Sequence, residues 1–232
     1  MALILPHVRV RMSQWASALV ILVPLVLLST QWLDKGIDGV HRWLSLGPIR
    51  LHIGLLLVPA LLTIHAREAS RYSTLSLMVC GMIIGSQPDL GMTVGLSIAL
   101  AAIVLARRRQ GDLLPFIGLL VAFAGALAAV DPLQPVPLVE NVLTDSWQWT
   151  PWTGPLTLLG TLLLPAALLW RARMDSSSMV SAFALTGLWV GLLLASVIGA
   201  YPVPLLGYGA SAVLGWGLAL ALQLADGTGT GR

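Results

Sequence analysis

The sequence is poor in charged side chains and almost free of cysteine. Only 10% of its 232 residues are Asp, Glu, Lys or Arg, whereas soluble globular domains carry about 25%. A chain so depleted in charge is expected to meet lipid or other apolar helices over most of its surface. The single cysteine, Cys80, lies within an apolar run, which excludes an internal disulfide and a thiolate metal site.

Basic clusters and gathered histidines are also missing. The formal net charge is +3, but Lys and Arg are scattered over short segments and form no patch that would indicate nucleic-acid binding. His52 and His65 are separated by about 20 Å along one predicted helix, so they cannot share a metal ion. The sequence therefore predicts neither a nucleic-acid partner nor a histidine metal site.

Long apolar runs dominate the chain. A bilayer core of about 30 Å requires roughly 20 apolar helical residues, and lipid cannot satisfy open backbone groups. The first run follows two arginines, but it is long for a signal peptide and lacks an Ala-x-Ala-like site, so we interpret it as a retained span. The sequence predicts an all-α polytopic membrane helix bundle, with residues 1–232 as one integral domain and eight spans near 13–31, 50–66, 72–87, 90–106, 113–130, 153–171, 178–200 and 205–224.

The positive charges predict the orientation, because Lys and Arg favour cytoplasmic loops. With the N-terminus inside, the inner segments hold ten of the thirteen basic residues and the outer loops hold Lys35, Arg42 and Arg50. Both termini are therefore expected in the cytoplasm, with residues 225–232 as a disordered tail. Most of the acidic residues fall in outer loops, so a site built on carboxylates should face outward.

Three motifs stand at predicted outer ends of spans. Residues 39–50 carry Arg42 and Trp43, which also suit an ordinary interface anchor. Residues 87–91 read Gln-Pro-Asp-Leu-Gly, in which Asp89 is placed to cap the following helix. Residues 202–211 contain two prolines and two glycines, with Tyr208 and Ser211 able to bond either a ligand or a neighbouring helix.

A fourth outer segment, residues 131–149, combines carboxylates with tryptophans. Glu140, Thr144 and Asp145 precede Trp147 and Trp149. Such a carboxylate could act as general base towards a sugar hydroxyl, or could hold Mg²⁺ or Mn²⁺ through oxygen ligands. The alternative is a solvated loop with a tryptophan belt.

In this order, the motifs resemble the SEDS family, the FtsW and RodA group of cell-cycle and cell-shape membrane proteins. Gly39, Arg42, Trp43, Leu46 and Gly47 match its first motif, residues 87–91 match its second throughout, and Pro202, Pro204, Tyr208, Gly209 and Ser211 match most of its third. Thr144-Asp145 is the nearest match to the family's aspartate motif. The resemblance extends over about residues 30–224.

The resemblance implies an inner-membrane protein of bacterial cell-wall synthesis that binds a lipid-linked disaccharide precursor. Asp145 would be the catalytic base. The implied substrate-binding residues are Arg42, facing the diphosphate, with Trp43, Gln87, Asp89, Glu140, Thr144, Tyr208 and Ser211. Membrane lipids and a penicillin-binding transpeptidase would be its partners.

The chain departs from the family where the chemistry should lie. The outer loop at 131–149 is much shorter, and Leu51-His-Ile-Gly-Leu55 replaces a segment with a glutamate and a lysine. Aligning the motifs makes the first predicted span equivalent to the family's third, so two N-terminal helices are expected to be missing. Three functions stay open: a peptidoglycan glycosyltransferase, an inactive relative that scaffolds a cell-wall synthesis partner, and a transporter of a lipid-linked intermediate.

Overall fold

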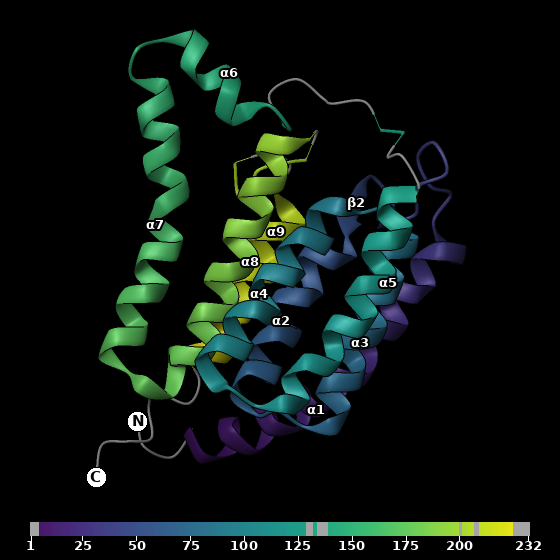
Figure 1. The fold of residues 1–232 in the computed structure, drawn as a ribbon, viewed down its shortest axis with the longest axis vertical. Helices are drawn as coiled ribbons and strands as arrows, with labels where there is room; N and C mark the ends of the chain where they lie inside the picture. The colour runs from purple at the N-terminus through teal and green to yellow at the C-terminus, as the bar shows by residue number, and fades with distance from the viewer. Residues whose placement is uncertain (1–4, 129–131, 134–138, 200, 207–208, 225–232) are drawn as a thin grey trace.

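The computed structural model describes residues 5–128, 132–133, 139–199, 201–206 and 209–224. Most of them form helices, and the long helices pack together in one bundle (Figure 1). The elements in chain order are α1 (Leu5–Leu33), β1 (Trp43–Leu46), β2 (Ile49–His52), α2 (Ile53–Arg67), α3 (Arg71–Ser86), α4 (Leu90–Arg107), η1 (Gln110–Leu113), α5 (Leu114–Ala128), α6 (Val142–Trp149), α7 (Thr153–Met174), η2 (Ser176–Ser178), α8 (Met179–Ile198) and α9 (Ala210–Leu224).

Each predicted span overlaps one of the long helices, but two of the predicted starts are wrong. Residues 50–52 belong to β2 and pair with β1, because Ile49-Arg50-Leu51-His52 alternates with the period of a strand. The last helix begins at Ala210 and not at 205, because Pro202 and Pro204 interrupt helical hydrogen bonding. The short helix α6 and the two-stranded hairpin were not predicted, but the predominantly helical fold agrees with the all-α prediction.

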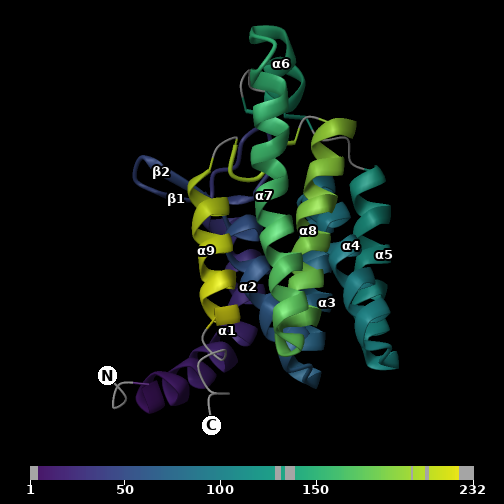
Figure 2. The same cartoon turned by 90° about the vertical axis from the view of Figure 1, so that its left-hand side faces the viewer.

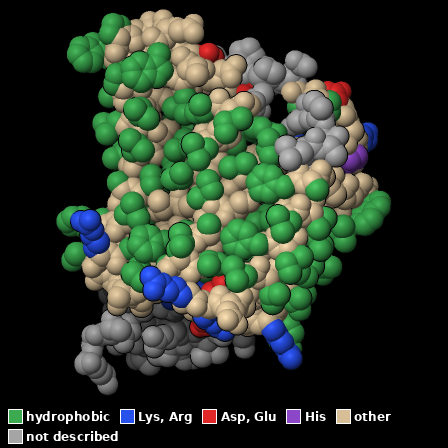
Figure 3. Space-filling model, in the orientation of Figure 1, with side chains coloured by type: hydrophobic (Ala, Val, Ile, Leu, Met, Phe, Trp, Pro, Cys, Tyr) green, Lys and Arg blue, Asp and Glu red, His purple; other side chains and the backbone are tan. Residues whose placement is uncertain are grey.

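Among the described residues, four helical segments are long and apolar enough to cross a membrane: Trp15–Leu33, Leu90–Arg107, Thr153–Met174 and Ser176–Ile198. Ile53–Arg67, Gln110–Gly125 and Ala210–Leu224 are apolar but shorter. Hydrophobic side chains cover the middle of the visible face, and most of the visible Lys and Arg lie near its lower end (Figure 3). The chain is thus a helical membrane protein, while eight spans and the cytoplasmic termini stay predictions.

Glycines allow the closest helix contacts in the bundle. A Cβ on Gly191 of α8 would lie 2.5 Å from the Cα of Gly95 on α4, and one on Gly85 of α3 would lie 2.2 Å from the Cα of Ala122 on α5. Small residues let helix backbones approach in this way inside membranes. These glycines therefore serve packing within the bundle.

The upper end of the molecule in Figure 1 carries the hairpin, α6 and the start of α9. The starts of α2 and α4 also belong to this end, because His52 leads from β2 into α2 and bonds Asp89 at the cap of α4. We call it the hairpin end. In Figures 1 and 2, α6 lies beyond the bundle at the tip of α7, away from the hairpin.

Candidate functional site

Arg42 donates hydrogen bonds to the turn between α3 and α4, which we call the corner. Its Nε donates to the carbonyl oxygen of Gln87 at 3.0 Å, and one terminal guanidinium nitrogen donates to that of Pro88 at 2.5 Å. The carbonyl of Arg42 accepts from the Ile53 N–H, 3.2 Å away, where α2 begins. Arg42 is only 5% exposed, so it acts here as a positioning residue for the corner.

Asp89 is the buried carboxylate of the same corner. Its Oδ1 accepts from the Met92 N–H at 2.9 Å and caps α4, as the sequence predicts, and its Oδ2 lies 3.1 Å from Nε2 of His52. Burial favours the neutral acid, but the Arg42 charge, the hydrogen bond and charge of His52 and the Met92 N–H outweigh it and lower the pKa of Asp89 to about 2. Asp89 is therefore ionised at neutral pH and balances Arg42.

His52 joins this corner to the start of α2. Its Nδ1 accepts from the Leu55 N–H at 3.2 Å, so in the neutral ring Nε2 carries the proton that is donated to Asp89. The ring of Trp43 meets the His52 ring edge-on, with centroids 5.8 Å apart. The sequence analysis considered His52 only as a metal ligand, so His52 is a site residue that it missed. The signal available was a polar residue just after the motif segment 39–50, at the outer end of a predicted span.

Gln87 and Ser211 link further segments to the corner. The Gln87 amide nitrogen donates to Oγ1 of Thr30 at 2.8 Å and so ties α3 to α1. The Ser211 hydroxyl accepts from the His52 N–H at 2.8 Å, which attaches the start of α9 to the hairpin. Ser211 thus bonds a neighbouring backbone, one of the two alternatives left open for it. Residues from all three motifs, Arg42, Trp43, Gln87, Asp89 and Ser211, therefore meet at one place, which we call the corner site.

The predicted loop residues lie on or beside α6 instead. Asp145 is half-buried within α6, Thr144 is exposed and donates to the Asn141 carbonyl at 2.9 Å, and Glu140 is half-buried just before the helix. Helix α6 packs against α7: Trp147 lies so close to Gly154 that a Cβ there would be 2.4 Å from its ring. In both views α6 is separated from the hairpin. The structure thus places Asp145 apart from the corner site, and Tyr208 lies outside the described residues.

No three His, Cys, Asp or Glu side chains gather as a metal site within the part of the chain that the structure describes. The described carboxylates near α6, Glu140 and Asp145, thus supply too few ligands to specify a Mg²⁺ or Mn²⁺ site. The predicted cation stays a prediction, and no catalytic step is derived through it.

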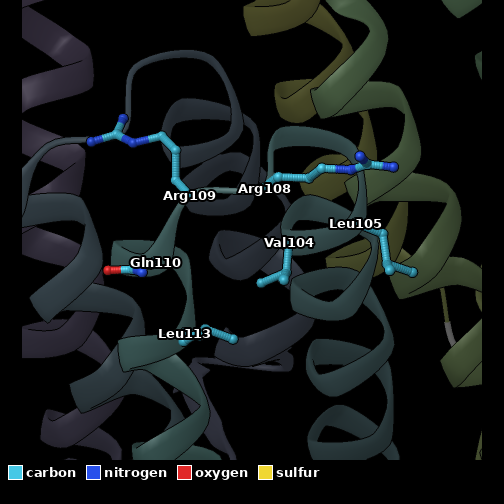
Figure 4. A pocket seen from close by; sticks show the side chains of 6 residues that line it. All are labelled: Val104, Leu105, Arg108, Arg109, Gln110 and Leu113. Carbon is cyan, nitrogen blue, oxygen red and sulfur yellow. The ribbon is translucent and has the colours of Figure 1, made fainter.

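Two further features lie at the opposite end of the bundle. Buried Asp112 and half-buried Arg107 form an ion pair with 3.1 Å between Oδ1 and the guanidinium, and His65 Nε2 is 3.4 Å from the same oxygen. Arg107 also donates to the carbonyls of His65 and Ala66, so this cluster fastens α2 to α4 and η1. Beside it, a hollow is lined by Val104, Leu105, Arg108, Arg109, Gln110 and Leu113. Arg108 and Arg109 point in opposite directions (Figure 4) and do not converge on one ligand.

Comparison with known proteins gives one informative match. The chain is similar to an FtsW protein. It is 28% identical over 157 residues to "Probable peptidoglycan glycosyltransferase FtsW" of Shewanella sediminis (strain HAW-EB3), and the match covers 60% of this chain and 38% of that relative. The chain therefore spans well under half of that FtsW. No family model matches the chain, and no solved structure matches it.

This match agrees with the SEDS resemblance of the motifs and weakly supports a relationship to that family.

Proposed function

We propose that this chain is an inner-membrane protein of peptidoglycan synthesis that binds a lipid-linked glycan precursor at the hairpin end. The likeness to FtsW carries this proposal, because the matched relative is described as a peptidoglycan glycosyltransferase. The convergence of the three motif segments supports it, since residues far apart in the sequence form one buried, charge-balanced corner at the end of the bundle.

In this proposal the buried residues of the corner site hold the hairpin and α4 in position, and less buried side chains contact the glycan precursor. Arg42 and Asp89 are 5% and 3% exposed, so they fix the positions of the hairpin and of α4. Trp43 is half-buried on that frame, and an aromatic face suits the apolar face of a sugar ring. Asp145 on α6 would act as the base that accepts the proton of the acceptor hydroxyl in polymerisation.

The second candidate is a non-catalytic relative that scaffolds a cell-wall synthesis partner, such as a penicillin-binding transpeptidase. The separation of α6 from the hairpin favours it, because the proposed base and the corner site belong to distant elements. Under this alternative the precursor or the partner protein would bind at the hairpin end, and Asp145 would catalyse no reaction.

Binding tests the proposal before any catalytic step. Purified protein in lipid nanodiscs should bind a lipid-linked disaccharide diphosphate, and Trp43→Ala should weaken binding about tenfold, the equivalent of about 1.4 kcal/mol, since aromatic contacts supply up to about 1.5 kcal/mol. Trp32→Ala is the matched control, because Trp32 is 72% exposed at the end of α1. Absence of binding in the unmodified protein would contradict the proposal.

A further inference from the structure

The β1–β2 hairpin has two faces of different chemistry. Its register pairs Leu44 with Leu51 and Leu46 with Ile49, in alternation with Trp43–His52 and Ser45–Arg50. Successive side chains of a strand point to opposite faces, and directly paired residues share a face. One face is therefore wholly aliphatic, and the other carries an indole, an imidazole, a hydroxyl and a guanidinium.

The aliphatic face is partly buried against the protein core at the base of the hairpin and exposed at its tip. Leu44 and Leu51, at the base, are partly buried and pack against the hydrophobic core. Leu46 and Ile49, on the same face at the tip, are 64% and 54% exposed. Gly47, in the turn between them, has φ of +61°, a conformation that glycine adopts without strain. The tip therefore presents two adjacent apolar side chains that the bundle does not cover.

The hairpin lies at the level where the helices end. β2 runs directly into α2 at Ile53 and packs against α9. In Figure 2 the hairpin projects sideways past α9 and does not extend beyond the ends of the helices. For a bundle that crosses a membrane, this places the tip beside the bundle at the bilayer surface.

We propose that the hairpin is an interfacial membrane contact: Leu46 and Ile49 insert among the lipids of the leaflet at the hairpin end, and the polar face with Arg50 meets water and headgroup phosphates. Amphipathic segments bind membrane interfaces in this orientation. A protein partner fits less well, because a stable interface takes about 800 Å² per partner and the tip offers two side chains. This contact would keep the neighbouring corner site at the depth of the lipid headgroups. The membrane contact does not depend on whether the chain binds a glycan precursor.

Site-directed spin labelling tests this inference in vesicles of phosphatidylethanolamine and phosphatidylglycerol. Cys80 is fully buried, and its replacement in Cys80→Ala gives a background for single labels at Leu46→Cys, Ile49→Cys and Ser45→Cys. Gln148→Cys on exposed α6 is the water reference, and Leu159→Cys, at a 57% exposed position on α7, is the lipid reference. Collision with oxygen and with a water-soluble nickel chelate is measured at each label.

The labels at 46 and 49 should match the lipid reference, with at least about fivefold less nickel collision than at 148, while the label at 45 should match the water reference. Circular dichroism of each labelled protein checks that the helices are retained. Water-like collision at both 46 and 49 in these vesicles would overturn the inference. So would protection at these positions that arises only when a second protein is added, because the tip would then be a protein-docking surface.

Discussion

At the scale of single residues, Asp89 is the group whose charge the corner site depends on. It is 3% exposed and faces the Arg42 charge and the His52 ring. Removal of one partner from a buried charge pair typically costs about 3–5 kcal/mol, because the other charge is left uncompensated. Asp89→Asn should therefore lower the stability of the solubilised protein by about this amount, measured as thermal unfolding at pH 7.

The same residue predicts a pH dependence. The pKa of Asp89 is lowered to about 2 in the folded protein, against about 3.9 in an unfolded chain. The stabilisation is therefore present above pH 3.9 and is lost as the pH falls towards 2. The stability difference between the unmodified protein and Asp89→Asn should be nearly constant from pH 7 to 5 and should shrink by about 2 kcal/mol between pH 4 and 2.

Asp38→Asn is the control for both measurements. Asp38 is exposed and has φ of +51°, a conformation that Asn also tolerates. This variant should unfold like the unmodified protein at every pH. Equal behaviour of Asp38→Asn and Asp89→Asn would show that the Asp89 charge contributes no special stability.

At the scale of elements, close backbone packing decides how α9 attaches to α2. A Cβ on Gly215 would lie 2.1 Å from the carbonyl oxygen of Leu55, whereas nothing lies within 4 Å of one on Gly217, two residues along the same helix. Overpacking of this kind costs about 1–3 kcal/mol or more. Gly215→Ala should therefore unfold at lower temperature than the unmodified protein, and Gly217→Ala should not. A stable Gly215→Ala variant would show that α9 does not pack as described.

The helices could be predicted from the sequence because an apolar run of membrane-spanning length has few other stable conformations. The hairpin was missed because Trp43–Leu46 and Ile49–His52 are short, and the second strand joins directly onto an apolar helix. The Asp89 cap could be predicted from local chemistry, since it bonds Met92 three residues away. The His52–Asp89 contact could not, because it joins residues that only the tertiary fold brings together.

The candidate site could likewise be located from the sequence, but the contacts of its side chains could not be predicted. Three outer motifs were expected to act together, and the structure brings five of their residues into one corner. Arg42 was expected to face a diphosphate, yet its nitrogens donate to the carbonyls of Gln87 and Pro88. Sequence identifies a guanidinium at the right end of a span, but only the fold shows what it bonds.

At the scale of the whole molecule, the distribution of basic residues predicts the orientation. Cysteine labelling with a membrane-impermeant maleimide should modify Ser45→Cys and Gln148→Cys from the periplasmic side. Gln110→Cys should react only after the membrane is opened. Buried Cys80 provides the unlabelled background. Reaction of Gln110→Cys in intact cells would reverse the orientation and place the hairpin end in the cytoplasm.

Polymerisation of a lipid-linked disaccharide by the purified protein in nanodiscs tests whether this chain acts on such a precursor with Asp145 as the base. Loss of a general base typically costs about 10²–10⁴ in rate, while a change at a half-buried helix position outside the bundle should leave folding intact. We expect glycan polymer from the unmodified protein, loss of that product in Asp145→Asn, and a smaller effect of Glu140→Gln. Equal polymerisation by the unmodified protein and Asp145→Asn, or no polymer from either, would contradict catalysis at Asp145.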